Sequence, residues 1–170
     1  MTHSSRPNAG DGPTSREEGA PRAASKASRT FGPERRVRKR AEFQDIQGQG
    51  RRVPTRHFVL LLRARAARSG ARLGVTASKR VGNSVVRSRI KRIVREAFRH
   101  ADGLFDDDVD VVVLVRGNVS ELAPSQVLAE WRDARSRVKR AAESARRDLV
   151  SGVSAPAAPR SRGRGGGATR

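Results

Sequence analysis

A short stretch of the chain, residues 78–99, concentrates positive charge at helical spacing. It reads SKRVGNSVVRSRIKRIVREAFR, in which eight basic residues are accompanied by a single acid, Glu96. At 3.6 residues per turn the apolar side chains fall on one stripe: Val86, Ile90, Ile93 and Ala97, widened by Val94 and Phe98. The basic side chains occupy the remaining arc, where they can contact phosphate oxygens. The pattern therefore predicts a helix with one face in a protein core and the other against a polyanion.

The composition of the whole chain supports the same chemistry. Its 170 residues carry a net charge of +20, and the pI is near 11.9, which is typical of proteins that bind nucleic acid or an anionic membrane. No apolar run is long enough to span a bilayer, so we expect no membrane partner. The chain has no cysteine, which excludes disulfides and zinc-binding thiolates and favours the cytoplasm. Its three histidines are isolated, and we predict no metal site.

Composition along the chain predicts one folded domain between two tails. Residues 1–33 and 150–170 are poor in apolar side chains and are predicted to be disordered, whereas residues 34–149 form the domain. Within it the patterns predict a helix over 36–47 that Gly48 and Gly50 stop, strands over 57–66 and 71–77, the basic helix, a buried strand over 109–115 and a last helix from Pro124 to about residue 145. In the second strand we expect one buried face and one open face.

Asn83 or Ser84 is expected to cap the basic helix, and Gly82 to form the turn before it. Because the helix lies between two strands, the order predicts an α+β domain, a sheet with helices packed on it. The general rule for such crossovers predicts a right-handed connection.

The motif K-R-V-G-N-x-V-V-R-x-R-I-K-R-x-x-R-E-A-F, which begins at Lys79, resembles the signature of the protein subunit of bacterial ribonuclease P. The similarity extends over about residues 34–149 and includes GRRVPTRHFVLLL, RLGVTASK and DVVVLVRG. The resemblance implies a two-layer α+β sandwich with a central mixed sheet, in the order α-β-β-(β)-α-β-α. It also implies a left-handed crossover, contrary to the general rule.

The resemblance further implies a function. The protein would bind a catalytic RNA, and the ribonucleoprotein would hydrolyse one phosphodiester bond to remove the 5′ leader of precursor tRNA. The RNA would perform the chemistry with Mg2+ that is held mainly by the RNA. The protein would contribute substrate affinity and help to organise metal binding, but it would be inactive alone and would contribute no catalytic residue. The resemblance indicates no obligate protein partner.

Two sets of residues match the family's binding positions. The positions that match its RNA-contacting motif are Lys79, Arg80, Asn83, Arg87, Ser88, Arg89, Lys91, Arg92 and Arg95. Relatives typically carry asparagine at the position of Ser88, and Asn83 can either cap the helix or contact RNA. A second surface, a cleft for the single-stranded leader, would be lined by Arg38, Phe43, Gln47, Arg52 and Phe58. Phenylalanine rings stack on unpaired bases, although both could instead belong to the core.

Three other functions compete with this interpretation. An intrinsic nuclease would need a cluster of acids for magnesium, and the only candidates are Asp106, Asp107, Asp108 and Asp110, which are more typical of a polar loop. A non-catalytic RNA-binding protein of the ribosomal type would share the charge and the helix on a sheet. A DNA-binding protein is a weaker option. Neither of the last two requires the glycine and asparagine ahead of the paired arginines.

Overall fold

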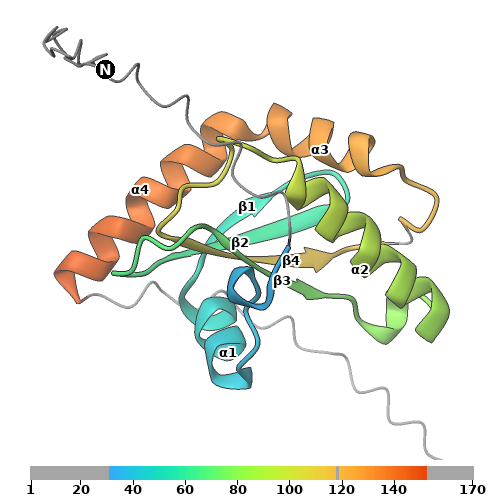
Figure 1. The fold of residues 1–170 in the computed structure, drawn as a ribbon, viewed down its shortest axis with the longest axis horizontal. Coiled ribbons are helices and arrows are strands. Elements are labelled where there is room, and N and C mark those ends of the chain that lie inside the picture. Colours follow the sequence, from blue (N-terminus) through green and yellow to red (C-terminus); the bar gives the residue numbers. More distant parts are fainter. Residues whose placement is uncertain (1–30, 118, 153–170) are drawn as a thin grey trace, which may run out of the picture.

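The computed structural model describes residues 31–117 and 119–152, which form a four-stranded mixed sheet with helices on both faces (Figure 1). The strands are β1 (Arg51–Pro54), β2 (Phe58–Ala64), β3 (Arg72–Thr76) and β4 (Val109–Val115), and their order across the sheet is β1-β2-β4-β3. The helices are α1 (Arg40–Gln49), α2 (Ser84–Arg99), α3 (Pro124–Asp133) and α4 (Arg135–Ser151), with short 3-10 turns η1 (Pro33–Arg35) and η2 (Lys79–Val81).

The sheet forms around β4, which pairs with β2 on one side and β3 on the other. The β2 pairing is antiparallel, whereas β3 pairs parallel because α2 connects it to β4. Val111, Val112 and Val113 are fully buried, which confirms the prediction of a strand covered on both faces. The α+β class with a mixed sheet is also confirmed. The handedness of the β3-α2-β4 crossover stays a prediction.

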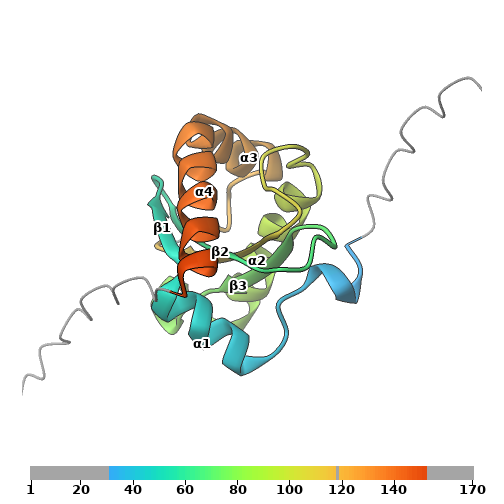
Figure 2. The same ribbon diagram turned by 90° about the vertical axis from the view of Figure 1, so that its left-hand side faces the viewer.

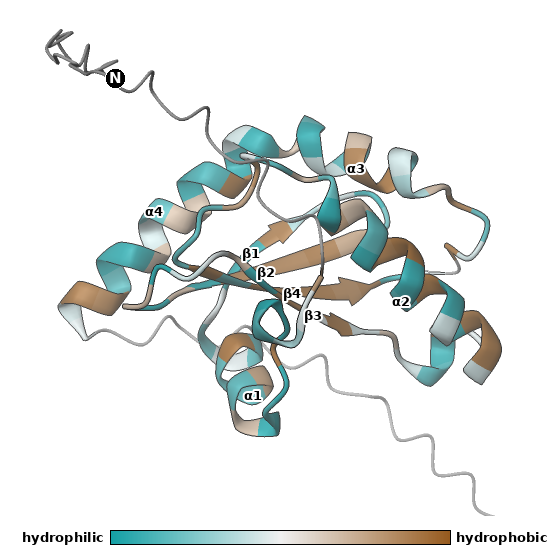
Figure 3. Ribbon diagram, viewed as in Figure 1, coloured by the Kyte–Doolittle hydropathy of each residue, from teal (hydrophilic) through white to brown (hydrophobic). Residues whose placement is uncertain are grey.

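One face of the sheet packs against α2, α3 and α4 and forms the larger core. Leu60, Leu62, Val111 and Val113 point to this face, in register with one another, and contact the buried side chains of the three helices. Trp131 of α3 is fully buried, with its ring 6.0 Å from that of Phe58 in an edge-on arrangement. Brown strands beneath helices of mixed colour in Figure 3 show the same division between apolar sheet and amphipathic helices.

The single last helix predicted from Pro124 is two helices, α3 and α4, which meet at Ala134. Its φ of −88° and ψ of 4° depart from helical values, and α4 extends to Ser151. The buried residues keep a spacing of three or four through this break: Val127, Trp131, Ala134, Val138 and Ala142. Hydrophobic periodicity therefore does not reveal it.

The opposite face of the sheet is covered in part by α1, which lies apart from the other helices in Figures 1 and 2. Ile46 of α1 packs there with Val59, Leu61 and Val112, and Phe43 is partly buried beside them. The predicted helix over 36–47 is wrong at both ends, because α1 begins at Arg40 and includes Gly48 before Gly50 ends it.

Val37, which was expected inside the first helix, lies in an extended segment instead. Its backbone N–H donates to the carbonyl of Leu73 in β3 at 3.1 Å, beside a parallel bridge between Arg36 and Leu73. This segment therefore extends the outer edge of β3 before the chain turns into α1.

Gly74 of β3 lets α1 approach the sheet. A Cβ atom at this position would lie 2.6 Å from Cζ of Phe43 and 3.0 Å from Cγ2 of Val112. The face of β3 that was predicted to be open is therefore occupied, and Gly74 itself is buried. Only a hydrogen atom leaves room for the Phe43 ring, so this contact sets how closely α1 packs.

Gly74→Ala is expected to destabilise the domain by about 1 to 3 kcal/mol, because the added methyl group collides with the Phe43 ring. Adding Phe43→Ala should remove much of this extra cost, since the collision partner is gone. Urea denaturation of the two single variants and the double variant measures the coupling. Strictly additive effects would show that Gly74 and Phe43 do not make this contact.

The acidic loop before β4 is held by ion pairs with α4. Arg146 donates to Asp108 at 2.7 and 2.8 Å and to Asp106 at 2.7 Å, and Lys139 also pairs with Asp106. Burial raises the pKa of Asp106, but hydrogen bonds from Lys139 and Arg146 outweigh it and bring the pKa below its ordinary value of 3.8. The hydrogen bond from Arg146 likewise lowers the pKa of Asp108. These acids anchor the C-terminal helix.

We expect the free energy of unfolding to fall as the pH drops below the ordinary carboxyl pKa of 3.8. A carboxyl group whose pKa is lower in the folded state stabilises the fold above its unfolded pKa and ceases to do so as it is protonated. In the Arg146→Gln variant the free energy of unfolding should fall less steeply as the pH drops, because the substitution removes a cation that pairs with Asp106 and Asp108. Urea denaturation over a pH series measures both curves, and identical slopes would contradict this role.

The predicted N-terminal boundary of the domain, after Pro33, lies too far along the chain. Phe31 lies edge-on to Phe98 of α2 with ring centres 5.8 Å apart, so residues 31–33 belong to the domain. At the other end, α4 continues past the predicted boundary after residue 149. The remaining parts of the two predicted tails, 1–30 and 153–170, lie outside the described residues. Among the described residues, no helix is long and apolar enough to cross a membrane.

Candidate nucleic-acid interface

The start of α2 is fixed by Gly82 and Asn83. Gly82 has a φ of +147°, which side chains disfavour, and a Cβ atom there would lie 2.8 Å from Cγ1 of Val86. Asn83 caps the helix, because its Oδ1 accepts a hydrogen bond from the backbone N–H of Val86 at 3.0 Å. Of the two roles considered for Asn83, the structure shows the cap. The glycine and asparagine ahead of the paired arginines therefore set the direction of the helix.

The predicted division of α2 into an apolar and a basic face is confirmed. Ile90, Val94 and Ala97 are fully buried against the sheet and α3, while Val86 and Ile93 are partly buried at the margin of the core. On the other face Ser88, Arg89 and Arg92 are exposed. Three cations there are partly exposed: Arg87, Lys91 and Arg95. Lys79 and Arg80 are exposed on η2, directly before the helix.

Seven cations of this region have no acid within ion-pair distance among the described residues: Lys79, Arg80, Arg87, Arg89, Lys91, Arg92 and Arg95. We call them the α2 surface. Glu96 does not neutralise them, because it pairs with Arg99 at 2.6 Å and with His100 at 3.0 Å. The hydrogen bond from Arg99 is the main cause of the lowered pKa of Glu96.

Arg95 shows how concentrated this charge is. Burial lowers the pKa of its guanidinium, and the positive charges of Arg36 and Arg92 lower it further. Arg36 comes from the segment before α1, where its guanidinium lies 5.1 Å from the centre of the Phe31 ring. Cations that repel one another and have no acid partner are stabilised when phosphate groups bind to them. The α2 surface is therefore suited to a nucleic-acid backbone.

A second candidate surface lies on the α1 side of the sheet. The structure places Phe43, Gln47 and Arg52 on this side, and exposed Arg38 lies just before α1. Gln47 donates from Nε2 to Oγ1 of Thr76 at 3.4 Å, and Phe43 remains partly exposed above Gly74. We call Phe43, Gln47, Thr76, Leu114 and Arg52 the α1 surface. It combines an aromatic ring, amide and hydroxyl groups and a cation, which suits an unpaired nucleic-acid strand.

The expectation that Phe58 lines the same cleft is wrong. Phe58 is 0% exposed and packs against Trp131, on the face of the sheet that α2, α3 and α4 cover. Neighbouring residues of a strand point to opposite faces, so Val59 rather than Phe58 faces α1. An aromatic ring in this position stabilises the core and cannot reach a base.

Several residues of these surfaces were not identified from the sequence. Leu114 was expected to be buried within its apolar strand, yet it is only partly buried beside Thr76, its partner in register. The expectation of one open face on the strand that contains Thr76 was the available signal.

The described residues do not form a metal site. No group of three or more acidic or histidine side chains among them is placed to hold a metal ion. Asp106 and Asp108 are engaged by Lys139 and Arg146, and Asp110 pairs with Arg72 at 2.6 Å and with Arg65 at 3.1 Å. This donor set does not fit hydrated Mg2+, which prefers free carboxylates in an octahedral arrangement.

The sequence of this chain is similar to those of known proteins. The ribonuclease P protein components of Shouchella clausii and Syntrophus aciditrophicus are 39% and 37% identical over 94 and 95 residues. These alignments cover 55% and 56% of this chain and 77% and 79% of the relatives.

Solved structures are similar as well. The RNase P protein of Staphylococcus aureus superposes with a TM-score of 0.51 at 30% identity, over 58% of this chain and 90% of that one. The RNase P protein of Thermotoga maritima superposes with a TM-score of 0.53 at 29% identity, over 60% of this chain and 96% of that one. The family model for ribonuclease P matches residues 31–144, most of the described domain. This chain belongs to the ribonuclease P protein family.

Proposed function

We propose that this chain is the protein component of ribonuclease P, which binds the catalytic RNA through the α2 surface and assists removal of the 5′ leader from precursor tRNA. The observation that carries the proposal is the α2 surface, whose seven cations lie on a capped helix and on the turn before it and have no acid partners among the described residues. Phosphates of a folded RNA would displace the counterions that this surface otherwise attracts. Family membership makes the RNA of ribonuclease P the partner.

In this proposal the RNA performs the chemistry and holds the Mg2+ that phosphodiester hydrolysis uses. Three acids of the loop before β4 and of β4 itself support this division, because Asp106, Asp108 and Asp110 form ion pairs within the fold. The protein then contributes affinity for the precursor and positive charge that offsets repulsion between two RNA molecules. No residue of this chain is assigned to the bond-breaking step.

The α1 surface is the proposed site for the single-stranded leader. Phe43 would stack on an unpaired base, while Arg52 and Arg38 would contact phosphates at either side. Gln47 and Thr76, already joined by a hydrogen bond, offer further polar atoms to base edges. Because this surface and the α2 surface are separate, one protein can contact the catalytic RNA and the leader together.

Phe43→Leu is expected to weaken binding of precursor tRNA to the holoenzyme roughly 5- to 100-fold, the loss of about one stacked base. Leucine keeps an apolar side chain beside Gly74 but has no ring to stack. Affinities for precursor and mature tRNA measured side by side isolate the effect, since mature tRNA has no leader. An equal loss for both RNAs would contradict leader contact at Phe43.

Reconstitution tests the function as a whole. Precursor tRNA is incubated at low Mg2+ with a bacterial ribonuclease P RNA alone, with the chain alone, and with both. We expect cleavage at the mature 5′ end to require the RNA and to become faster with the chain, which should be inactive by itself. If the chain binds RNA but does not accelerate cleavage, a non-catalytic RNA-binding role of the ribosomal type replaces the proposal.

A further inference from the structure

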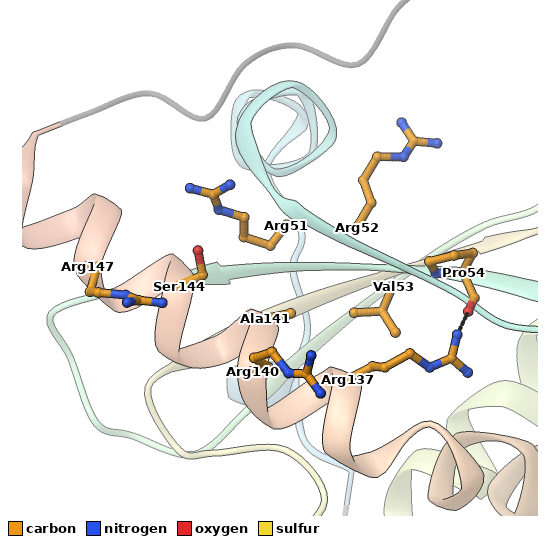
Figure 4. A pocket seen from close by; sticks show the side chains of 9 residues that line it. All are labelled: Arg51, Arg52, Val53, Pro54, Arg137, Arg140, Ala141, Ser144 and Arg147. Atoms are coloured by element: carbon orange, nitrogen blue, oxygen red, sulfur yellow. Dashed lines mark hydrogen bonds between the residues drawn. The ribbon is translucent and has the colours of Figure 1, made fainter.

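A groove rich in arginine lies between β1 and α4, at the edge of the sheet opposite β3. It has a volume of about 460 Å³ and is lined by Arg51, Arg52, Val53, Pro54, Arg137, Arg140, Ala141, Ser144 and Arg147 (Figure 4). We call it the β1–α4 groove. Neither the basic motif of α2 nor the α1 surface includes the α4 side of this groove, so the arginines of α4 have no role in the function proposed above.

Most of the positive charge in this groove is uncompensated. Arg51 forms an ion pair with Asp148 at 2.5 Å, and Arg137 donates to the carbonyl oxygen of Pro54 at 2.8 Å. Arg52, Arg140 and Arg147 are exposed and have no ion pair within the described residues. Some arginines elsewhere on this domain do pair with acids, as Arg63 does with Asp45 and Arg72 with Asp110. The groove therefore attracts an anion.

The spacing of the arginines fits an extended polyanion. Arg137, Arg140, Ser144 and Arg147 follow one another at three or four residues and so share one face of α4. From Arg137 to Arg147 this face runs about 15 Å along the helix axis, the length of a few nucleotides of single strand. Figure 4 shows these side chains on one side of the groove and Arg51 and Arg52 on the other.

Arg52 connects this groove to the α1 surface. Its partner in register is Leu61, which packs in the cluster beneath α1, whereas Arg51 pairs with Leu62 of the opposite face. Since β1 has a neighbour on one side only, the two arginines lie on the two faces of an edge strand. A flexible single strand leaving the α1 surface can pass around this edge into the groove, whereas a rigid duplex cannot.

We propose that the β1–α4 groove binds the phosphate backbone of the upstream part of the precursor's 5′ leader, after the leader has crossed the α1 surface. The inference rests on the proposed function, because it requires that the α1 surface receives the leader. It predicts that the holoenzyme gains affinity as the leader is lengthened beyond the α1 surface. That gain depends on charge and not on base identity.

The test compares two double variants that each remove two exposed arginines. Arg140→Gln with Arg147→Gln removes charge from the groove, and Arg132→Gln with Arg135→Gln removes it from outside the groove. Holoenzymes with each variant are titrated with precursor tRNAs whose leaders are shortened one nucleotide at a time. Thermal unfolding and affinity for the RNA subunit alone are measured in parallel.

We expect the groove variant to lose about three- to tenfold in affinity for long-leader precursors relative to short-leader precursors, whereas the control keeps the wild-type difference. The slope of log affinity against log salt should fall by about 1.4 for the long leader, one single-strand contact per arginine. An equal loss at every leader length, or an equal loss in the control, would overturn the groove assignment.

Weaker binding of the RNA subunit alone would also overturn this assignment, because it would place the groove against the catalytic RNA. Failure of the proposed function looks different. In that case even the wild-type chain would give no faster cleavage and no preference for any leader.

Discussion

Replacing Arg89 and Arg92 together with glutamine is expected to weaken binding of the chain to ribonuclease P RNA by roughly 10- to 100-fold, while thermal stability stays unchanged. Both side chains are exposed and have no acid partner among the described residues, so their removal costs the fold little. Each would lose a charge-assisted hydrogen bond to phosphate. Filter binding or fluorescence anisotropy over a salt series measures the change, and the salt slope should fall by about 1.8.

The matched control for this experiment is Arg132→Gln with Arg135→Gln, which changes the net charge equally outside the α2 surface. It should lower affinity much less, because only general attraction is reduced. If both double variants weaken binding equally, net charge alone carries the interaction. The α2 surface would then have no specific role.

Ile90→Ala should have the largest effect on stability, about 2 to 4 kcal/mol of lost free energy of unfolding. Ile90 is 0% exposed in the core between α2 and the sheet, so truncation removes buried methyl groups and leaves a cavity. Urea denaturation gives the value directly. Binding to RNA measured well below the melting temperature should change little, because the cationic side chains of α2 remain.

Val85→Ala provides the control on the same helix. Val85 is 74% exposed, so its truncation should change stability by no more than about 0.5 kcal/mol. Equal destabilisation by the two substitutions would mean that α2 is rotated about its axis relative to the orientation described. The same rotation would also bury part of the α2 surface.

Sequence reasoning succeeded where one element carries the whole signal. The basic helix combines a period of 3.6 residues with a cap and a glycine turn, so its two faces follow from local geometry alone. The β4 strand is likewise recognisable as a short, continuous apolar run between polar segments. The observed strand and the predicted strand both run from residue 109 to residue 115.

It failed where a position depends on contacts between distant segments. Phe58 begins its strand, and its aromatic ring could face either side until Trp131 of α3 is placed beside it. The start of α1 was misplaced because Val37 bonds to β3, a partner far along the chain. The β1–α4 groove joins residues near 51 with residues near 140, so no local pattern reveals it.

The absence of cysteine from the sequence allows the central claim to be tested at single positions. Ser88→Cys places a thiol on the exposed face of α2, and Ser125→Cys places one at an exposed position of α3. Each thiol carries a tethered iron chelate that generates hydroxyl radicals in the complex with ribonuclease P RNA. We predict localised cuts in that RNA from position 88 and few from position 125. Cuts from position 125 with none from position 88 would contradict the proposal that α2 binds the catalytic RNA.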